Sequence, residues 1–393
     1  DWRGEFADIT GAGGFDAMVG NPPYGAELAE MERRYLNSVF GVGSSDTAAL
    51  MMVQALRLVR KGGLVSFIVP KPFTYASNWE GTRNLLLPQI SEVVDTGKVW
   101  REVKLEMVIF QAEGDSDNDE YRTAVRKGQT IVPLGTIQKS DSREFGFILN
   151  GISEEELLIG RKVRQGSIPL SSVVSNIRGG MFQKLVEQGG SGKRVLGGAQ
   201  IGRYQAVGQK GFVPPKTDLP PNAFVLTNSL LVQNIVAHIE NPTPHIKIIG
   251  TVLEDKLIDE CIILDTVNQL TVRDNGYSSK FLLGILHSQL INWFVYRFIF
   301  AKAIRTMHFD GPVTARIPIP RLDGNQGNAQ HARMVALVQQ MLDLHQRAAA
   351  EGNPQVKTLL QRQIDATDKQ IDRLVYGLYG LTEAEIGVVE GAG

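Results

Sequence analysis

Four consecutive residues, Asn21-Pro-Pro-Tyr24, combine the groups that can hold the exocyclic amino group of a flat ring. Asn21 offers a side-chain carbonyl as an acceptor, and the fixed φ angles of Pro22 and Pro23 aim a backbone carbonyl beside it. Tyr24 supplies an aromatic face on which the ring can stack. An amine that donates hydrogen bonds to two acceptors has a more available lone pair. The tetrapeptide therefore predicts methyl transfer to an amino nitrogen, although Asn-Pro and Pro-Pro also occur in ordinary turns.

The residues around the tetrapeptide predict a parallel α/β unit. Residues 15–20 form a short apolar strand, and residues 48–60 form a helix that ends at Gly62 and Gly63. Residues 64–69 then form a second buried strand that ends at a proline. Ligands bind at the carboxyl ends of parallel strands, and the tetrapeptide lies at one of these ends.

In this setting the tetrapeptide resembles that of the TaqI-like N6-adenine DNA methyltransferases found in type II and IIG restriction-modification systems. The resemblance implies Asn21, Pro22, Pro23 and Tyr24 as catalytic residues acting on double-stranded DNA. It also implies S-adenosylmethionine as the cofactor, with Asn21 bordering it. Relatives hold this donor in a glycine-rich loop well upstream, whereas Gly11-Ala-Gly13-Gly14 precedes a strand and reads as a loop. We therefore expect an N-terminally truncated fragment that lacks most of the donor site and is inactive alone.

Two further aromatic residues are candidates for the same site. Residues 94–100 and 105–110 predict adjacent strands joined by a turn, with Trp100 at the end of the first. By the resemblance, Trp100 occupies the position of the second aromatic residue that stacks on the substrate base. A buried core tryptophan is the alternative for this position. Phe73, which follows the second strand, could line the same opening.

A basic segment follows the predicted catalytic region, although the net charge of the whole chain is only −1. Between Arg161 and Lys216 there are ten Lys or Arg residues and one acid, Glu187. Lysine and arginine displace counterions from a phosphate backbone, and glycines let backbone amides approach it. The segment therefore predicts contact with nucleic acid, with a solvated loop-rich surface as the alternative.

Short motifs in the same region resemble the specificity domain of TaqI-like enzymes. These motifs are Asn176-Ile-Arg-Gly-Gly180, Leu196-Gly-Gly-Ala-Gln-Ile-Gly-Arg203-Tyr204, Ile235-Val-Ala-His238, Leu283–Trp293 and Ile317-Pro-Ile-Pro320. The resemblance implies a domain that reads DNA through its grooves. Arg178, Arg203 and Arg305 are the candidate contacts to groove or phosphate, with structural salt bridges as the alternative role.

The expected fold class is α/β, with a partial Rossmann-like methyltransferase sheet, an α+β DNA-recognition domain and C-terminal helices. We expect residues 1–145 to form the C-terminal part of the catalytic domain, residues 146–322 the specificity domain and residues 323–393 the helical region. The acid-rich residues 113–120 predict an exposed loop. Apolar residues at helical spacing predict two helices within residues 329–377, broken at Gly352-Asn-Pro354.

Composition excludes several classes of protein. The single cysteine, Cys261, excludes a disulfide framework, and six scattered histidines predict no bound metal. Polar residues interrupt the apolar segment 281–301, which predicts a core helix rather than a membrane span. With 43% hydrophobic and 21% charged residues and no visible signal peptide, the expected setting is cytoplasmic, without a membrane partner.

Three other functions compete with adenine methylation. Asp95 with Glu102-Val-Lys104 resembles the D…E-x-K set that holds Mg²⁺ in many restriction nucleases, at an unusually short spacing. The chain could instead be a specificity module without its own catalysis. A fused or separate restriction nuclease is a candidate partner of the methyltransferase. N4-methylation of cytosine uses a similar amine. The basic region disfavours RNA and protein-glutamine methyltransferases, which share this type of tetrapeptide.

Overall fold

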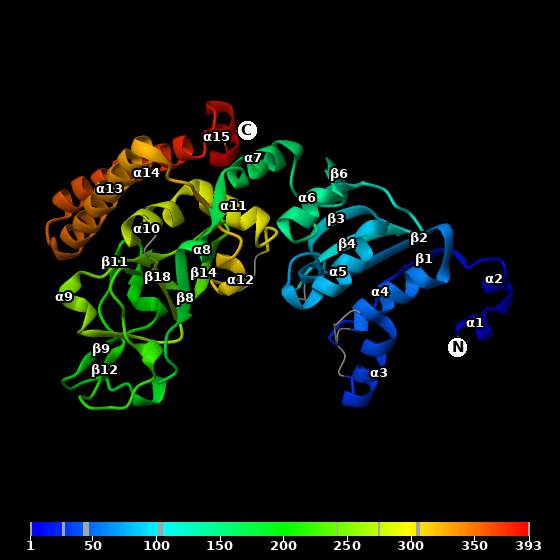
Figure 1. Cartoon of the computed structure of the whole chain (residues 1–393), viewed down its shortest axis with the longest axis horizontal. Coiled ribbons are helices and arrows are strands. Elements are labelled where there is room, and N and C mark those ends of the chain that lie inside the picture. The colour runs from blue at the N-terminus through cyan, green and yellow to red at the C-terminus, as the bar shows by residue number, and fades with distance from the viewer. Residues whose placement is uncertain are drawn as a thin grey trace. The chain divides into compact units, whose positions relative to one another are not determined.

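The computed structural model describes residues 2–25, 28–41, 47–100, 105–241, 243–273, 276–303 and 307–391. The chain separates into two compact units. Unit 1 comprises Asp1–Leu158 and Arg297–Ile304, and unit 2 comprises Ile159–Tyr296 and Arg305–Gly393. The expected boundaries near residues 145 and 322 remain predictions, and the C-terminal helices group with unit 2 (Figure 1).

Unit 1 is built on one mixed sheet of six strands in the order β1-β2-β4-β3-β5-β6. The strands β1 and β2 pair in parallel, as do β3 and β5, and the other neighbours are antiparallel. The α/β class with parallel strands is thus confirmed. The strands are β1 (Phe15–Gly20), β2 (Val59–Pro70), β3 (Ile90–Lys98), β4 (Glu106–Glu113), β5 (Glu120–Lys127) and β6 (Thr130–Gln138).

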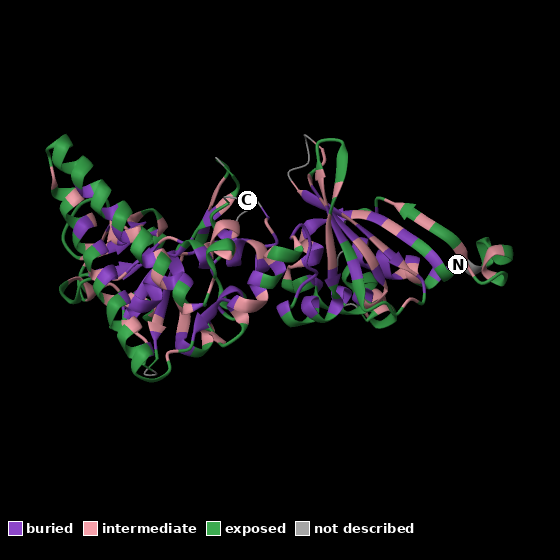
Figure 2. Ribbon diagram, turned by 90° about the horizontal axis from the view of Figure 1, so that it is seen from above, coloured by how far each residue is buried: buried purple, intermediate pink, exposed green. Residues whose placement is uncertain are grey.

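Short helices accompany this sheet, and the central strands are largely buried (Figure 2). The helices of this part of the chain are α1 (Trp2–Glu5), α2 (Ala7–Gly11), α3 (Glu30–Phe40), α4 (Thr47–Leu58), α5 (Glu80–Leu86), α6 (Lys139–Phe145) and α7 (Glu154–Arg164). Helix α4 buries Ala48, Met52 and Ala55, which recur at helical spacing. The predicted strand, helix and second strand between residues 15 and 70 are therefore confirmed, and the connection before the helix contains an additional helix, α3.

The predicted end of the helix over residues 48–60 at Gly62 and Gly63 is wrong. Helix α4 ends at Leu58, and both glycines lie within β2. The backbone N–H of Gly62 donates to the carbonyl of Gly114, and Gly114 donates to the carbonyl of Gly63, both at 2.8 Å. A Cβ on Gly63 would lie 2.8 Å from the carbonyl oxygen of Phe15. These glycines allow close approach of three backbone segments, which extends the strand instead of capping the helix.

Two other predictions for unit 1 are confirmed. Strands β3 and β4 form an antiparallel pair, with Lys98 opposite Glu106. The acid-rich segment connects β4, which ends at Glu113, to β5, which begins at Glu120.

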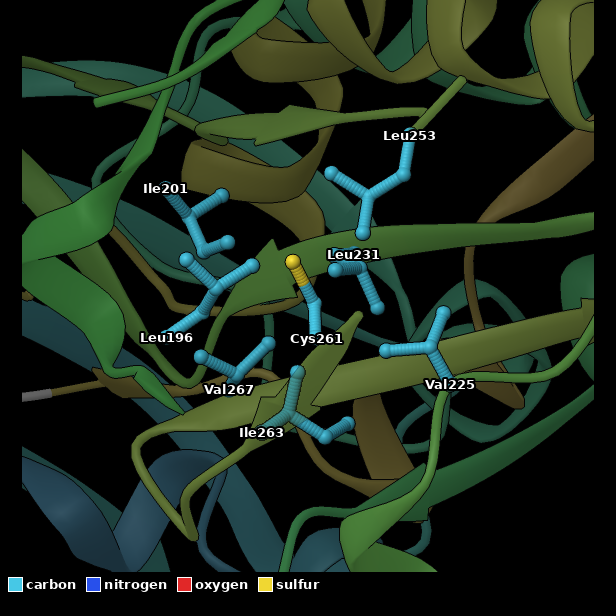
Figure 3. Packing of buried hydrophobic residues seen from close by; sticks show 8 residues of the cluster. All are labelled: Leu196, Ile201, Val225, Leu231, Leu253, Cys261, Ile263 and Val267. Carbon is cyan, nitrogen blue, oxygen red and sulfur yellow. The ribbon is translucent and has the colours of Figure 1, made fainter. Parts of the chain in front are cut away.

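Unit 2 contains several small sheets, the largest with the strand order β16-β13-β18-β8. A three-stranded sheet, β12-β9-β17, lies in the same unit. Cys261 of β17 packs in an apolar cluster with residues such as Leu196, Leu231 and Ile263 (Figure 3). Burial raises the pKa of the Cys261 thiol, so this cysteine is a core residue rather than a reactive one.

The strands of unit 2 are β7 (Ser167–Pro169), β8 (Val174–Arg178), β9 (Lys193–Leu196), β10 (Ile201–Gly202), β11 (Gln205–Ala206), β12 (Gly211–Val213), β13 (Ser229–Gln233), β14 (Ile235–Ile239), β15 (His245–Lys247), β16 (Gly250–Thr251), β17 (Cys261–Ile263), β18 (Val267–Val272), β19 (Met307–His308) and β20 (Pro318–Pro320).

The apolar segment 281–301 forms two helices rather than the single expected core helix. The break falls at Ser288, whose hydroxyl accepts a hydrogen bond from the N–H of Ile291 at 3.3 Å. In the described part of the chain, no helix has the length and apolar character needed to cross a membrane. The helices are α8 (Leu170–Val173), α9 (Asp255–Ile258), α10 (Ser279–His287), α11 (Gln289–Phe298), α12 (Gly311–Thr314), α13 (Gly324–Ala350), α14 (Pro354–Leu378) and α15 (Glu383–Glu390).

The two predicted C-terminal helices are confirmed as α13 and α14, which lie side by side (Figure 1). The expected break at residues 352–354 separates them. Asn353 caps α14 because its side chain accepts a hydrogen bond from the N–H of Gln355 at 2.9 Å.

Candidate functional site

The tetrapeptide follows the last residue of β1, at the carboxyl edge of the sheet in unit 1. Gly20 pairs with Phe67 of β2. A Cβ on Gly20 would lie 3.2 Å from the Phe67 ring, so glycine lets the strand end pass close over this aromatic residue. The predicted position of Asn21 at the carboxyl end of a parallel strand is therefore confirmed.

Within the tetrapeptide, the Pro23 carbonyl accepts a hydrogen bond, whereas the Asn21 side chain makes none to the described residues. The Thr47 hydroxyl, at the start of α4, donates a hydrogen bond to the carbonyl of Pro23 at 2.7 Å. Pro22 is buried, Tyr24 is half-buried and Asn21 is exposed. The Asn21 carboxamide has no hydrogen-bond partner in the part of the chain that the structure describes. The backbone is thus tied down on both sides of an amide that is available to a ligand.

Trp100 lies at the same edge of the sheet as Asn21. Strands β2 and β3 are both antiparallel to β4, so β1, β2 and β3 all run in one direction. Neighbouring strands are about 4.8 Å apart, which puts the strand leading to Trp100 roughly 14 Å from the strand leading to Asn21. Trp100 is half-buried and comes two residues after β3. The sheet thus brings Trp100 and the tetrapeptide, which contains Tyr24, to one edge.

A buried lysine with two carboxylates occupies the edge between these strands. Lys71 follows β2, and its Nζ lies 2.7 Å from Oδ2 of Asp95 and 3.8 Å from Oε1 of Glu106. The Lys71 side chain is only 2% exposed. The other Asp95 oxygen accepts a hydrogen bond from the N–H of Gly97 at 3.1 Å. These contacts fix the ends of β2, β3 and β4, because a buried charge is stable only when it is paired.

The same contacts bear on the nuclease alternative. Asp95, its expected metal ligand, is already paired with Lys71, whereas Glu102 and Lys104 lie outside the described residues. Within the described ranges, no three His, Cys, Asp or Glu side chains form a group that could hold a metal ion.

Phe73 does not line the opening. Its side chain is 0% exposed and packs against Trp79 and Phe110, with ring centroids 5.7 and 5.8 Å away. The expectation for Phe73 is therefore wrong, because the 3-10 turn after β2 directs this ring into the core.

The residues described here do not form a complete site for S-adenosylmethionine. Gly13 and Gly14 have φ angles of +101° and +123°, and they precede β1 at the edge opposite Asn21. A Cβ on Gly14 would lie 2.5 Å from the carbonyl oxygen of Leu58, so this turn is a packing feature. In the described ranges, no glycine-rich turn follows a parallel strand at the carboxyl edge.

A second charged cluster in unit 1 has no local signal in the sequence. Glu156 of α7 accepts hydrogen bonds from Nε of Arg297 at 2.6 Å and from Nζ of Lys302 at 3.3 Å. Burial raises the pKa of Glu156, but the two cations lower it further, and the net shift is downward. Phe298 stacks on Phe145 at 4.9 Å. The two cationic partners of Glu156 are more than 140 residues away in the chain, so spacing alone could not reveal them.

The three candidate arginines of unit 2 differ in their surroundings. The Nε–H of Arg178 donates to the carbonyl of Asp265, yet the side chain remains 53% exposed. The two terminal nitrogens of Arg203 lie 2.7 and 2.6 Å from the carboxylate oxygens of Asp368 on α14. Arg305 lies outside the described residues. The structure therefore leaves about half of the Arg178 side chain accessible to a ligand, although its Nη2 also lies 3.5 Å from Oδ2 of Asp265. It uses Arg203 to tie α14 to the turn after β10.

Other cations of the basic segment are on the surface. Lys184, Lys210 and Lys216 are exposed, and none of them has an ion-pair partner in the described part of unit 2. Lys162 pairs with Glu385 at 2.7 Å, so it is a structural residue. The exposed lysines and Arg178 form the candidate nucleic-acid surface of unit 2.

Residues 1–99 match the family model described as Eco57I restriction-modification methylase. This stretch of the chain is similar to restriction-modification methylases. It contains the tetrapeptide and the strands β1, β2 and β3. The resemblance expected from the tetrapeptide is therefore confirmed at the level of restriction-modification methylases.

The chain is also similar to one curated protein and to solved structures. The Type II methyltransferase M.VspI of Vibrio sp. (strain 343) is 24% identical over 163 residues, which are 39% of this chain and 40% of that protein. The type IIL restriction-modification enzyme MmeI, solved in complex with DNA, matches with a TM-score of 0.52 and 13% sequence identity. The match covers 95% of this chain and 56% of the MmeI chain. The type IIG restriction endonuclease BpuSI matches with a TM-score of 0.34 and 12% sequence identity. The match covers 93% of this chain and 54% of the BpuSI chain. The chain thus spans about half the length of these solved structures.

Proposed function

We propose that the protein is the catalytic edge and DNA-recognition unit of an adenine-specific DNA methyltransferase of a restriction-modification or phage-defence system. The reaction is transfer of a methyl group to the N6 amino group of an adenine that has been flipped out of the duplex. The main support is the exposed, unpartnered Asn21 carboxamide at a fixed strand end. The similarity of residues 1–99 to restriction-modification methylases supports the same class of reaction.

In this proposal Asn21 and the carbonyl of Pro22 accept hydrogen bonds from the two N–H groups of the adenine amine. The Pro23 carbonyl accepts a hydrogen bond from the Thr47 hydroxyl, which holds the backbone next to the Pro22 carbonyl. As the nitrogen attacks the methyl carbon it gains positive charge, and both acceptors bind it more strongly. With the donor bound, N6 would take the methyl carbon, and the donor sulfur would keep the electron pair of the broken bond. The methylated amine would then release a proton to water, so the site requires no poised general base.

S-adenosylmethionine would supply the electrophilic methyl group. Asn21 is the residue of the described chain that would border it, and Tyr24 and Trp100 would stack on the adenine. Flipping a base out of a duplex costs a few kcal/mol, and stacking on aromatic residues returns about 1–3 kcal/mol per base. The half-buried rings at one sheet edge support this role.

Recognition of double-stranded DNA is assigned to unit 2. Phosphate contacts from Arg178, Lys184, Lys210 and Lys216 would give affinity that falls with salt. Arg305 stays a predicted contact, whereas Arg203 takes the alternative structural role, because both of its terminal nitrogens are bonded to Asp368. A fused or separate restriction nuclease, cytoplasmic location and absence of a membrane partner remain predictions.

The test uses the protein expressed from its complete gene. We would incubate it with radiolabelled S-adenosylmethionine in three parallel reactions. The methyl acceptor is duplex DNA in the first, structured RNA in the second and a protein mixture in the third. The proposal predicts label in duplex DNA alone. Label only in RNA or protein would contradict it. Binding of duplex DNA without transfer would favour the alternative, a specificity module that lacks catalysis.

A further inference from the structure

Met181 is the most exposed large apolar side chain in the described part of unit 2. It is 78% exposed, and Ile177 and Leu185 beside it in the chain are 42% and 43% exposed. Single exposed apolar residues are common on protein surfaces. Met181 differs from them because the backbone that carries it is held rigidly.

Hydrogen bonds and packing fix the segment on both sides of Met181. Gly179 donates to the carbonyl of Val267 at 2.9 Å, and Gly180 donates to the carbonyl of Ile263 at 3.0 Å. A Cβ on Gly179 would collide with the backbone of Leu264, so the glycine permits this close contact. The next side chain, Phe182, is 3% exposed and lies in a buried apolar cluster. With Phe182 held in the core, Met181 is held outward.

The surroundings of Met181 are basic. Arg178 and Lys184 lie three residues before and after it and are exposed. Of the carboxylates near this segment, Asp265 is 17% exposed and is paired with Arg178 and the side-chain amide of Gln183, whereas Glu187, three residues after Lys184, is exposed. In duplex DNA, stacked apolar bases lie between two phosphate backbones. Exposed cations complement the phosphates, and an apolar side chain between these cations complements the bases. A protein partner with an apolar surface would not require these cations.

We propose that Met181 is a wedge that inserts between base pairs of the bound DNA and unstacks one step. This inference rests on the proposed function in one respect, namely that unit 2 binds duplex DNA. Methionine is among the apolar side chains that proteins insert between base steps. An unstacked step lowers the cost of extruding a neighbouring base, which is what a methyltransferase acting on a flipped base needs.

The experiment first selects the bound sequence by repeated rounds of binding to random duplexes, which does not depend on methylation. Each adenine of that duplex is then replaced in turn by 2-aminopurine, whose fluorescence increases when it is unstacked. The wild-type protein is expected to brighten at least one position. Met181→Ala and the polar variant Met181→Gln are expected to lose most of this signal at saturating protein, whereas Met181→Leu retains it.

Leu359→Ala is the matched control, because Leu359 is a 54% exposed apolar residue of α14. It is expected to keep the wild-type signal. Equal signals from wild type and Met181→Ala would overturn the wedge, as would brightening by neither protein. Failure to bind any duplex would overturn both proposals. If brightening depends on Met181 but no methyl group is transferred, the wedge stands and the proposed catalysis fails.

Discussion

The carboxyl edge of the sheet in unit 1 and the basic segment of unit 2 (residues 161–216) each pair a cation within the protein, but they leave different uncharged side chains exposed. At the sheet edge the cation Lys71 is buried and paired, and the neutral amide of Asn21 is exposed. In unit 2 the guanidinium of Arg203 is bound by Asp368, and the apolar Met181 is exposed. Charge alone therefore does not identify the residues that meet a ligand. What identifies them is a rigid backbone with an unpartnered side chain.

The largest expected effect is on catalysis by the sheet edge. Asn21→Ala removes one acceptor of a hydrogen bond from the adenine amine, and this hydrogen bond becomes stronger as the amine becomes cationic. We therefore expect the rate of methyl transfer to fall about 100- to 1,000-fold. Single-turnover methylation of saturated DNA measures this rate. The melting temperature and the DNA dissociation constant are expected to stay at the wild-type values, because Asn21 is exposed. A parallel loss of DNA binding would remove the distinction between the two regions.

The next effect concerns the buried cation of the same edge. Lys71→Met leaves Asp95 and Glu106 without their cation, and breaking a buried pair in this way costs about 3–5 kcal/mol of unfolding free energy. Urea denaturation followed by tryptophan fluorescence measures the loss. Lys61→Met is the control, because Lys61 is exposed and its loss is expected to have little effect. Equal stability of the two variants would show that the edge does not depend on Lys71.

A third comparison separates the two arginines of unit 2. Arg203→Ala and Asp368→Ala each break the bidentate pair, and we expect each to cost about 1–3 kcal/mol of unfolding free energy. We expect the two variants to bind DNA equally, because the guanidinium is already occupied by Asp368. Arg178→Ala is expected to weaken DNA binding and to reduce its salt dependence with little loss of stability. Weaker DNA binding by Arg203→Ala than by Asp368→Ala would assign Arg203 to the DNA contact.

The smallest effect is on the pH dependence of stability. Burial, together with the nearby charge of Asp368, raises the pKa of Asp372 on α14 to about 6, above its usual value near 4. The folded state then holds this proton more tightly than the unfolded state. The resulting stabilisation is complete below about pH 4 and is lost as the pH rises through 6.

Asp372→Asn removes this titration while keeping an oxygen that can accept from the N–H of Gln289. Melting temperatures measured every half pH unit test the prediction. The difference between the variant and the wild type is expected to grow in favour of the variant between pH 4 and pH 6.5. A difference that is constant over this range would contradict it.

Local patterns in the sequence predicted much of unit 1 and the C-terminal helices. The tetrapeptide, the β3–β4 pair and the break at residues 352–354 each have a signature within a few residues. The role of Gly62 and Gly63 was misjudged because it depends on Gly114, fifty residues away. The partners of Lys71 and Arg203 are also distant in sequence. Met181 and Phe182 are adjacent apolar residues, so their pattern could not show which is buried.

The identity of the methylated nucleoside tests the central claim most directly. Duplex DNA treated with the protein from its complete gene and S-adenosylmethionine would be digested to nucleosides and analysed by mass spectrometry. The account predicts N6-methyladenine from the wild-type protein and almost none from Asn21→Ala. N4-methylcytosine, or no methylated nucleoside from wild-type protein that binds the duplex, would contradict the assignment of Asn21 to Tyr24 as an adenine site.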